Sequence, residues 1–94
     1  MDIGQAIRRL RQKHDMTLTQ LSEQIGMSRN AVWAMETGKT YPPKATIEKL
    51  CDVFSLSPAL FQLSAIEEGD FPEEKRVLYR ALLEPLRNEL LDQQ

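Results

Sequence analysis

The chain contains little of the chemistry on which enzymes and metal proteins depend. Its 94 residues include one cysteine and one histidine, with no glycine-rich phosphate-binding loop and no cluster at metal-ligand spacing. A single cysteine, Cys51, excludes an internal disulfide and a cysteine-rich zinc site, and it falls within an apolar helical stripe. His14 lies at a predicted helix end, where a surface or capping role is expected. We therefore predict that the protein is no enzyme and binds neither a cofactor nor a metal ion.

Long apolar runs are missing as well. No stretch approaches the roughly 20 apolar residues needed to span a bilayer, and no basic segment followed by a short apolar run marks a signal peptide. With 41% hydrophobic residues, the chain can still form one buried core. We expect a small cytoplasmic protein with no membrane association.

The net charge of −2 is unevenly distributed. Residues 1–50 carry eight lysines and arginines against five acids, whereas residues 51–94 carry four against nine. Sign asymmetry of this kind is typical of a basic binding face joined to an acidic tail. The first half can therefore bind a polyanion although the whole chain is acidic.

Residues 17–38 have the pattern of two short amphipathic helices joined by a sharp turn. Thr17, with Gln20 three residues later, can form a capping box, and Gly26 can adopt the left-handed conformation that ends a helix. Ser28 can then cap the second helix. Two helices joined by a short turn containing glycine form the helix-turn-helix pattern.

The second of these helices, over about 28–37, has an unusual outer face. A period of 3.6 residues turns Val32 and Met35 inward. The same period places on the outer face Arg29, Asn30, Trp33 and Ala34. Arginine pairs with guanine, asparagine pairs with adenine, and an apolar surface can contact the thymine methyl group, so these residue types suit the major groove of DNA. The alternative is that the tryptophan packs on a neighbouring helix and that the polar residues are only solvated.

Three further helices complete an all-α bundle. The first runs over about 3–13 and is apolar on one side. Its outward cations are Arg8, Arg9 and Lys13. These cations could reach backbone phosphate. The prolines at 42 and 43 form a loop before a helix over about 44–54, and Ser57 with Pro58 begins the fifth helix.

Residues 3–63 resemble the phage repressor and Cro type of helix-turn-helix domain, also called the Xre family, which is a compact bundle of five helices. The positions that carry the resemblance are Arg11, Leu21, Gly26, Met27, Ser28, Val32, the run Met35-Glu36-Thr37-Gly38-Lys39, Pro42 or Pro43, Leu50 and Leu56. Two positions depart from the family pattern. Leu18 stands where many members have glutamine, and Ser22 stands where a buried alanine is usual.

The resemblance implies specific roles for these residues. The helix 28–37 would enter the major groove and contact bases through Arg29, Asn30, Trp33 and Ala34. The predicted phosphate contacts are Thr17, Leu18, Ser28, Thr37, Lys39, Thr40 and Tyr41. Arg11 and Glu36 would form a partly buried ion pair between the first helix and the recognition helix. The alternative for this pair is two separate surface charges, which would contribute little to stability.

Residues 67–94 lie outside the five-helix pattern and form a predicted helical extension. Glu67 to Asp70 are a polar break, after which the apolar residues recur mostly at a spacing of four. The predicted dimer or partner surface is Leu78, Leu82, Leu86 and Leu90. Pro85 interrupts the helix, so we expect a bend or two consecutive helices. The apolar stripe either folds back on the bundle or pairs with another subunit.

We therefore predict a DNA-binding domain over residues 1–66 with an extension over residues 67–94. The predicted function is that of a sequence-specific transcriptional regulator of double-stranded DNA, with repression as the default role and a homodimer as the working form. One alternative is an antitoxin that also binds a toxin partner through residues 70–94. Another is a protein-interaction adaptor that has kept the bundle but does not bind DNA.

Overall fold

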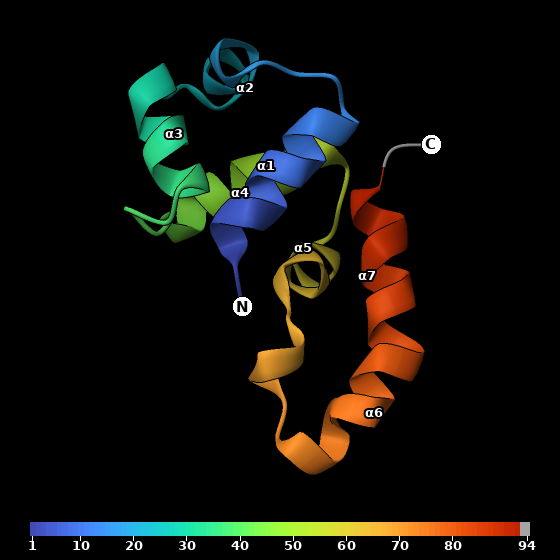
Figure 1. Ribbon diagram of the computed structural model, residues 1–94. Coiled ribbons are helices and arrows are strands. Elements are labelled where there is room, and N and C mark those ends of the chain that lie inside the picture. The colour runs from blue at the N-terminus through green and yellow to red at the C-terminus, as the bar shows by residue number, and fades with distance from the viewer. Residues whose placement is uncertain (93–94) are drawn as a thin grey trace.

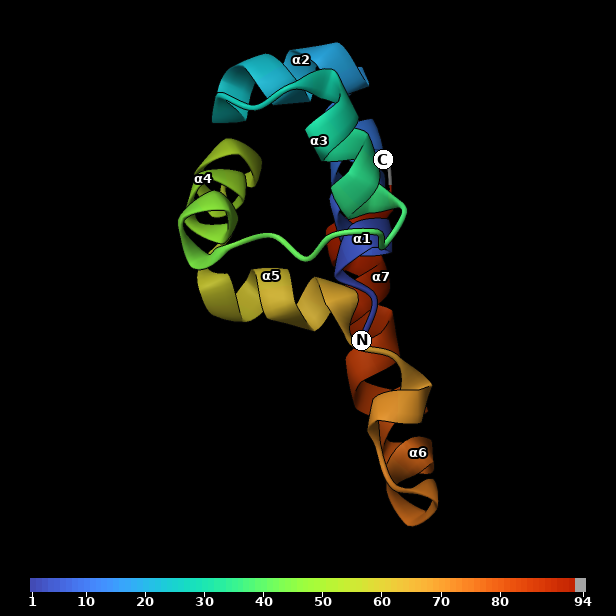
Figure 2. The same cartoon turned by 90° about the vertical axis from the view of Figure 1, so that its left-hand side faces the viewer.

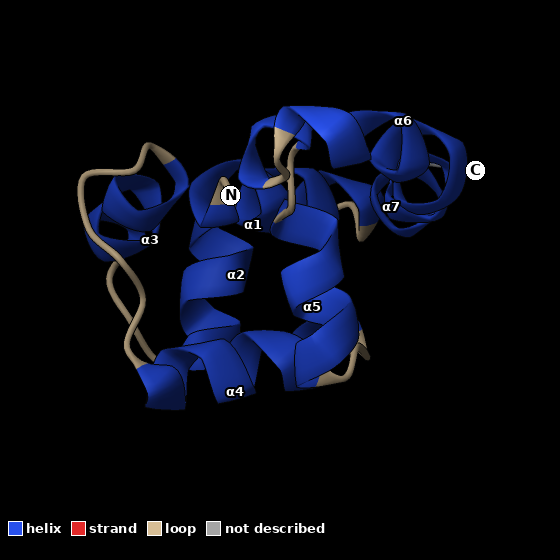
Figure 3. Cartoon of the chain, turned by 90° about the horizontal axis from the view of Figure 1, so that it is seen from below, coloured by secondary structure: helices blue, strands red, loops and turns tan. Residues whose placement is uncertain are grey.

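The computed structural model describes residues 1–92 of the chain. Gln93 and Gln94, the last two residues of the predicted extension, lie outside the described residues. The described part consists of helices, turns and loops and contains no strand, as Figure 3 shows. No helix within it is both long enough and apolar enough to cross a bilayer. The all-α prediction is confirmed.

Five helices form the bundle that was predicted for the first two thirds of the chain (Figure 1). They are α1 (Ile3–Lys13), α2 (Leu18–Ile25), α3 (Arg29–Glu36), α4 (Lys44–Phe54) and α5 (Pro58–Ala65). Their apolar faces meet in a single core, whose fully buried members include Ile7, Leu10, Leu21, Ile25, Val32, Leu50 and Phe61. Cys51 belongs to this core, and burial raises the pKa of its thiol, which keeps the thiol protonated near neutral pH.

The predicted start and stop signals hold the ends of the helix-turn-helix. The Thr17 hydroxyl accepts the N–H of Gln20 while the Gln20 side chain accepts the N–H of Thr17, which completes the capping box. Gly26 ends α2 in the left-handed conformation at φ 68°. Ser28 then accepts the N–H of Ala31 at the start of α3. The turn between α2 and α3 is therefore set by local hydrogen bonds.

Gly4 allows α1 and α3 to approach closely. A Cβ atom at this position would lie 2.5 Å from the carbonyl oxygen of Met35 and 2.6 Å from that of Glu36. Both oxygens belong to the backbone at the end of α3, so they cannot move aside as a flexible side chain could. The absence of a side chain at Gly4 thus allows the end of α3 to lie directly against α1.

The extension begins with two short 3₁₀ turns and continues as one interrupted helix. Its elements are η1 (Glu68–Asp70), η2 (Glu73–Lys75), α6 (Arg76–Leu78), the π-helix η3 (Tyr79–Leu83) and α7 (Glu84–Leu91). Pro85 has no N–H and sits in the first turn of α7. In the wide turn before it, Glu84 donates its N–H to the carbonyl of Tyr79, five residues back. The helix therefore continues through a π-helical turn, and its last part, α7, begins at Glu84 with Pro85 in its first turn, where the sequence predicted a bend or two consecutive helices.

The extension folds back on the bundle, where α7 packs against α1 and α5 (Figures 1 and 2). Leu91 and Tyr79 are buried. Lys13 Nζ donates to the carbonyls of Glu89 and Leu90 at 3.0 Å each, and so caps the negative end of α7. Arg9 forms an ion pair with Asp92 at 2.6 Å. Two of the three cations of α1 considered for phosphate binding, Arg9 and Lys13, therefore hold the extension instead, so that expectation is wrong for them.

We predict that Gly4→Ala destabilises the fold because the new methyl group would meet the backbone at the end of α3. The expected loss is about 1–3 kcal/mol, the usual cost of overpacking, and thermal unfolding followed by circular dichroism measures it. Gly69→Ala is the matched control, because its Cβ would meet nothing within 4 Å. Equal melting temperatures for the two variants would contradict the close approach.

Candidate nucleic-acid interface

The outer face of α3 is open to solvent, while its other face is anchored in the core. Val32 and Met35 are buried against the bundle, and α3 packs on α1 and α2. On the opposite side Arg29 and Asn30 are exposed, and Trp33 is 43% exposed. Ala34 is half-buried beside them. The four predicted base-contacting residues therefore lie on one accessible side of a rigidly held helix.

The acidic extension does not cover this face. In Figures 1 and 3, α3 and the α6–α7 extension lie on opposite sides of α1. The extension packs mainly on α1 and α5. Among residues 1–92, α3 is thus free to meet a ligand.

Trp33 is partly exposed beside a cation and an aliphatic side chain. Lys39 Nζ lies 4.4 Å from the centroid of the indole ring, at the distance of a cation–π contact. Trp33 lines a small hollow together with Leu18 of α2 and with Arg8 of α1. Trp33 is 43% exposed, so it is not buried against a neighbouring helix as the alternative interpretation required. An apolar surface flanked by two cations lies next to Arg29 instead.

Arg11 and Glu36 form a bidentate ion pair that joins α1 to α3. Arg11 Nε lies 2.7 Å from Glu36 Oε2, and Arg11 Nη2 lies 3.0 Å from Glu36 Oε1. The arginine side chain is 13% exposed and the carboxylate is 4% exposed. Arg11 Nη1 also donates to the carbonyl of Met16 at 2.8 Å, just before α2. One guanidinium therefore ties together both helices and the loop that leads into the helix-turn-helix.

The predicted phosphate contacts lie near α3, but several of their hydroxyl groups already have local partners. Thr17 and Ser28 accept backbone N–H groups as helix caps. The Thr37 hydroxyl donates to the carbonyl of Trp33 at 2.9 Å. At the start of α2, the first N–H groups have no acceptor within the helix, and Leu18 supplies one of them. Phosphate contact at these positions therefore depends more on backbone N–H groups than on side chains.

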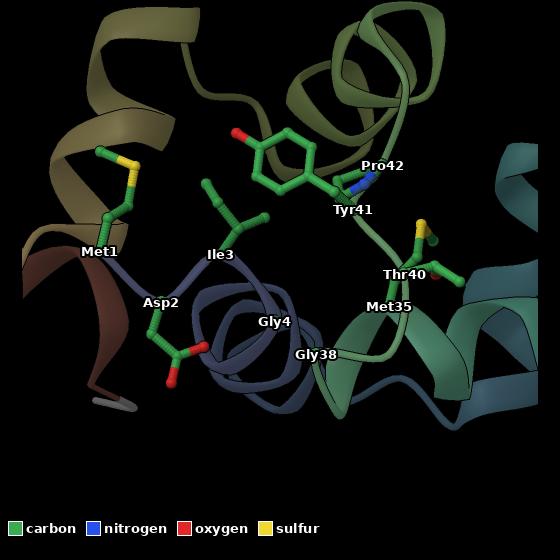
Figure 4. A pocket seen from close by; sticks show the side chains of 9 residues that line it. All are labelled: Met1, Asp2, Ile3, Gly4, Met35, Gly38, Thr40, Tyr41 and Pro42. Atoms are coloured by element: carbon green, nitrogen blue, oxygen red, sulfur yellow. The ribbon is translucent and has the colours of Figure 1, made fainter.

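The loop after α3 presents Lys39, Thr40 and Tyr41, all of them exposed. Figure 4 shows Tyr41 turned back over the start of α1, with its ring beside Ile3 and above a small hollow. Pro42 is buried and so holds this loop against the bundle. The loop thus has a fixed position at the C-terminal end of α3.

The comparison with known families agrees with this geometry. Residues 2–63 match the family model described as a helix-turn-helix domain. The chain belongs to this family. The match covers more than half of the 94 residues and includes α1 to α5. No curated protein and no solved structure matches the chain. Membership in the helix-turn-helix family supports DNA as a partner of the protein.

Two residues of this region were not among the predicted site residues. Gly4 was missed because a close helix approach leaves no local sequence signal. Arg8 was placed outward without a specific role, and the structure sets it beside Trp33 and Leu18. These side chains meet because of the angle at which α1 packs on α3, and this angle cannot be predicted from the periodicity of a single helix.

We predict that Glu36→Ala lowers stability by about 3–5 kcal/mol, because it leaves the partly buried Arg11 guanidinium without its carboxylate. For a domain of this size, the melting temperature should fall by roughly 12 °C or more. Glu23→Ala, on the exposed side of α2, is the control and should leave the melting temperature within about 2 °C. A shift below one degree for Glu36→Ala would show that the pair contributes little.

Proposed function

We propose that the protein is a sequence-specific transcriptional regulator of the phage repressor and Cro type, which inserts α3 into the major groove of double-stranded DNA. One observation carries the proposal: α3 is buried along Val32 and Met35 and presents Arg29, Asn30 and Trp33 outward. Arginine, asparagine and an apolar surface are groups that read base edges in the major groove. We propose that these residues, with Ala34, contact bases.

Phosphate contacts position the helix on the duplex in this proposal. The free N–H groups at the start of α2 meet one phosphate, as helix N-termini favour anions. Lys39, Thr40 and Tyr41 of the loop after α3 meet another. Arg8 adds a cation on the same side as Trp33. These contacts neutralise a few phosphates, so binding weakens steeply as the salt concentration rises.

The proposed working form is a homodimer on two half-sites. A single α3 of eight residues reaches few bases, and two-fold dimers of this architecture dock their recognition helices about one helical turn apart, roughly 34 Å. Occupation of a promoter by such a dimer represses transcription.

A second candidate function is an antitoxin that binds a toxin through residues 70–94 while α3 binds DNA. The uncovered apolar side chains of the extension favour it, since such surfaces commonly bind other proteins. Co-purification of a second small protein with the tagged chain supports this candidate, and a chain that purifies alone as a dimer argues against it.

We predict that Arg29→Ala relaxes the sequence preference at one base position. The protein is first used to select duplexes from a random pool, and the variant is then measured on the selected sequence and its single-base changes. A lost base contact weakens binding by about 1–3 kcal/mol, or roughly 5- to 150-fold. Lys75→Ala removes the same charge at an exposed position in η2 of the extension and is the control. Equal weakening of Arg29→Ala on every sequence would assign Arg29 to phosphate.

We predict that the selected duplex quenches or shifts the fluorescence of Trp33. It is the only tryptophan of the chain and is 43% exposed on the proposed contact surface, so the signal reports that surface alone. The change should saturate with duplex concentration and reverse on addition of salt. An adaptor that does not bind DNA would leave the emission unchanged with every duplex tested.

A further inference from the structure

A hollow of about 180 Å³, which we term the Trp33 hollow, lies where α1, α2 and α3 meet. The residues that line it are Arg8, Arg11, Leu18, Trp33, Glu36 and Thr37. The proposed function uses the N–H of Leu18 and the exposed surface of Trp33, but it assigns no ligand to the space between their side chains. The chemistry of the lining residues indicates what this space can bind.

Most polar groups of the Trp33 hollow already have partners within the protein. Arg11 binds the Glu36 carboxylate through two nitrogens and the carbonyl of Met16 through the third. The Thr37 hydroxyl donates to the carbonyl of Trp33 at 2.9 Å. A ligand that formed hydrogen bonds to these groups would compete with the existing bonds, whereas an apolar group leaves them intact. The hollow therefore suits a small apolar group.

Leu18 and Trp33 form the apolar walls of the hollow, and other contacts hold both of them in place. The Leu18 side chain packs against the core of the bundle, and the capping box between Thr17 and Gln20 fixes the first turn of α2, on which Leu18 lies. Trp33 stands on the anchored helix α3, with Lys39 Nζ 4.4 Å from the centroid of its ring. Because the walls are positioned in advance, a small apolar group binds without the cost of ordering them.

We propose that the Trp33 hollow binds the C5 methyl group of a pyrimidine in the major groove, so that Leu18 and Trp33 together determine specificity at one base position. Base edges in this groove present donors and acceptors, and the thymine methyl is the one apolar group among them. A 5-methylcytosine carries the same group. Trp33 follows Arg29 by one helical turn, about 6 Å along α3, so the methyl group lies within about two base pairs of the base that Arg29 contacts.

The charges around the hollow fit a nucleotide. Arg8 is an exposed cation among its lining residues, and Lys39 adds a second cation beside Trp33. Among residues 1–92, Glu36 is the one acid that lines the hollow, and Arg11 compensates its charge. The surroundings are therefore positive and attract phosphate. A free apolar molecule would gain nothing from these cations, whereas a nucleotide presents a methyl group and a phosphate together.

This inference deepens the proposed function and rests on it, and single-atom changes in the DNA test it. The full chain is titrated with the selected duplex after each thymine in turn is replaced by deoxyuridine, which removes only the methyl group. In a parallel series, each cytosine is replaced by 5-methylcytosine. Loss of one buried methyl group should weaken binding about fourfold, which corresponds to about 0.8 kcal/mol, and gain of one should strengthen binding by a similar factor.

The two series distinguish the sources of the methyl group. A loss with deoxyuridine alone assigns the hollow to thymine, and a gain with 5-methylcytosine alone assigns it to methylated cytosine. Effects of both bases at the same position show that the methyl group itself is recognised. If neither replacement changes the affinity at any position, the inference is overturned.

Leu18→Ala should abolish the methyl effect. The variant should bind the methylated duplex about fourfold more weakly than the wild type does, but should bind the duplex without the methyl group equally well. Leu18→Met keeps an apolar wall and should keep the effect. The matched control is Leu60→Ala, at a leucine of α5 that is 39% exposed, which should also keep it.

A purely structural role of Leu18 gives a different result. If Leu18 only supports α2, Leu18→Ala weakens binding equally with and without the methyl group, and this outcome overturns the inference. Circular dichroism shows whether the variant is folded. Trp33→Ala, at the 43% exposed wall, provides the same test should Leu18→Ala fail to fold.

The inference and the proposed function fail in different ways. If the selected duplex is bound in an Arg29-dependent manner but no methyl group affects the affinity, the inference fails and the DNA-binding function stands. If no duplex is bound, the regulator function fails, and the inference fails with it.

Discussion

The position of α3 depends on one guanidinium more than on any other polar group. Arg11 binds Glu36 at the end of α3, 25 residues later in the chain, and the carbonyl of Met16 in the loop before α2, so a single side chain joins three segments of the bundle. Because both side chains of the ion pair are largely buried, removing either one would leave the other as a buried charge without a partner. Gly4 complements this tie by letting α1 approach the same end of α3. α3 is therefore held by the Arg11–Glu36 ion pair at its last turn and by core packing along its inner face.

Local signals made most of the fold predictable. Caps at Thr17 and Ser28 and the left-handed Gly26 act within a few residues, so the sequence alone locates the turn between α2 and α3. The same holds for α4, whose observed bounds coincide with the predicted ones. The partners of α1 cations were not predictable in this way. Arg9 and Lys13 have the same outward placement as Arg8, yet they meet α7, which lies more than seventy residues later in the chain.

In the extension, the assumption of a regular α-helix was not enough to predict which apolar residues share a face. Periodicity merged all its apolar residues into one wide surface, because a constant 3.6-residue turn cannot separate Tyr79 from Leu78 and Leu82 cleanly. In the structure Tyr79 is buried with its ring 5.2 Å from that of Phe71, and Leu91 is buried in the core, whereas Leu78 and Leu82 face solvent. Folding back and pairing with another molecule are thus compatible, since they use different side chains of the same helix.

The wide turn before Pro85 also sets the rotation of α7 about its axis, and this rotation decides which side chains of α7 face the bundle and which face solvent. Deleting one residue there would turn everything downstream by about 100° relative to the preceding segment. Leu91 would leave the bundle and other side chains would replace it, although the composition of the segment would hardly change. Insertions and deletions at this single turn are therefore a route by which related chains could exchange their inner and outer surfaces without altering the DNA-binding half.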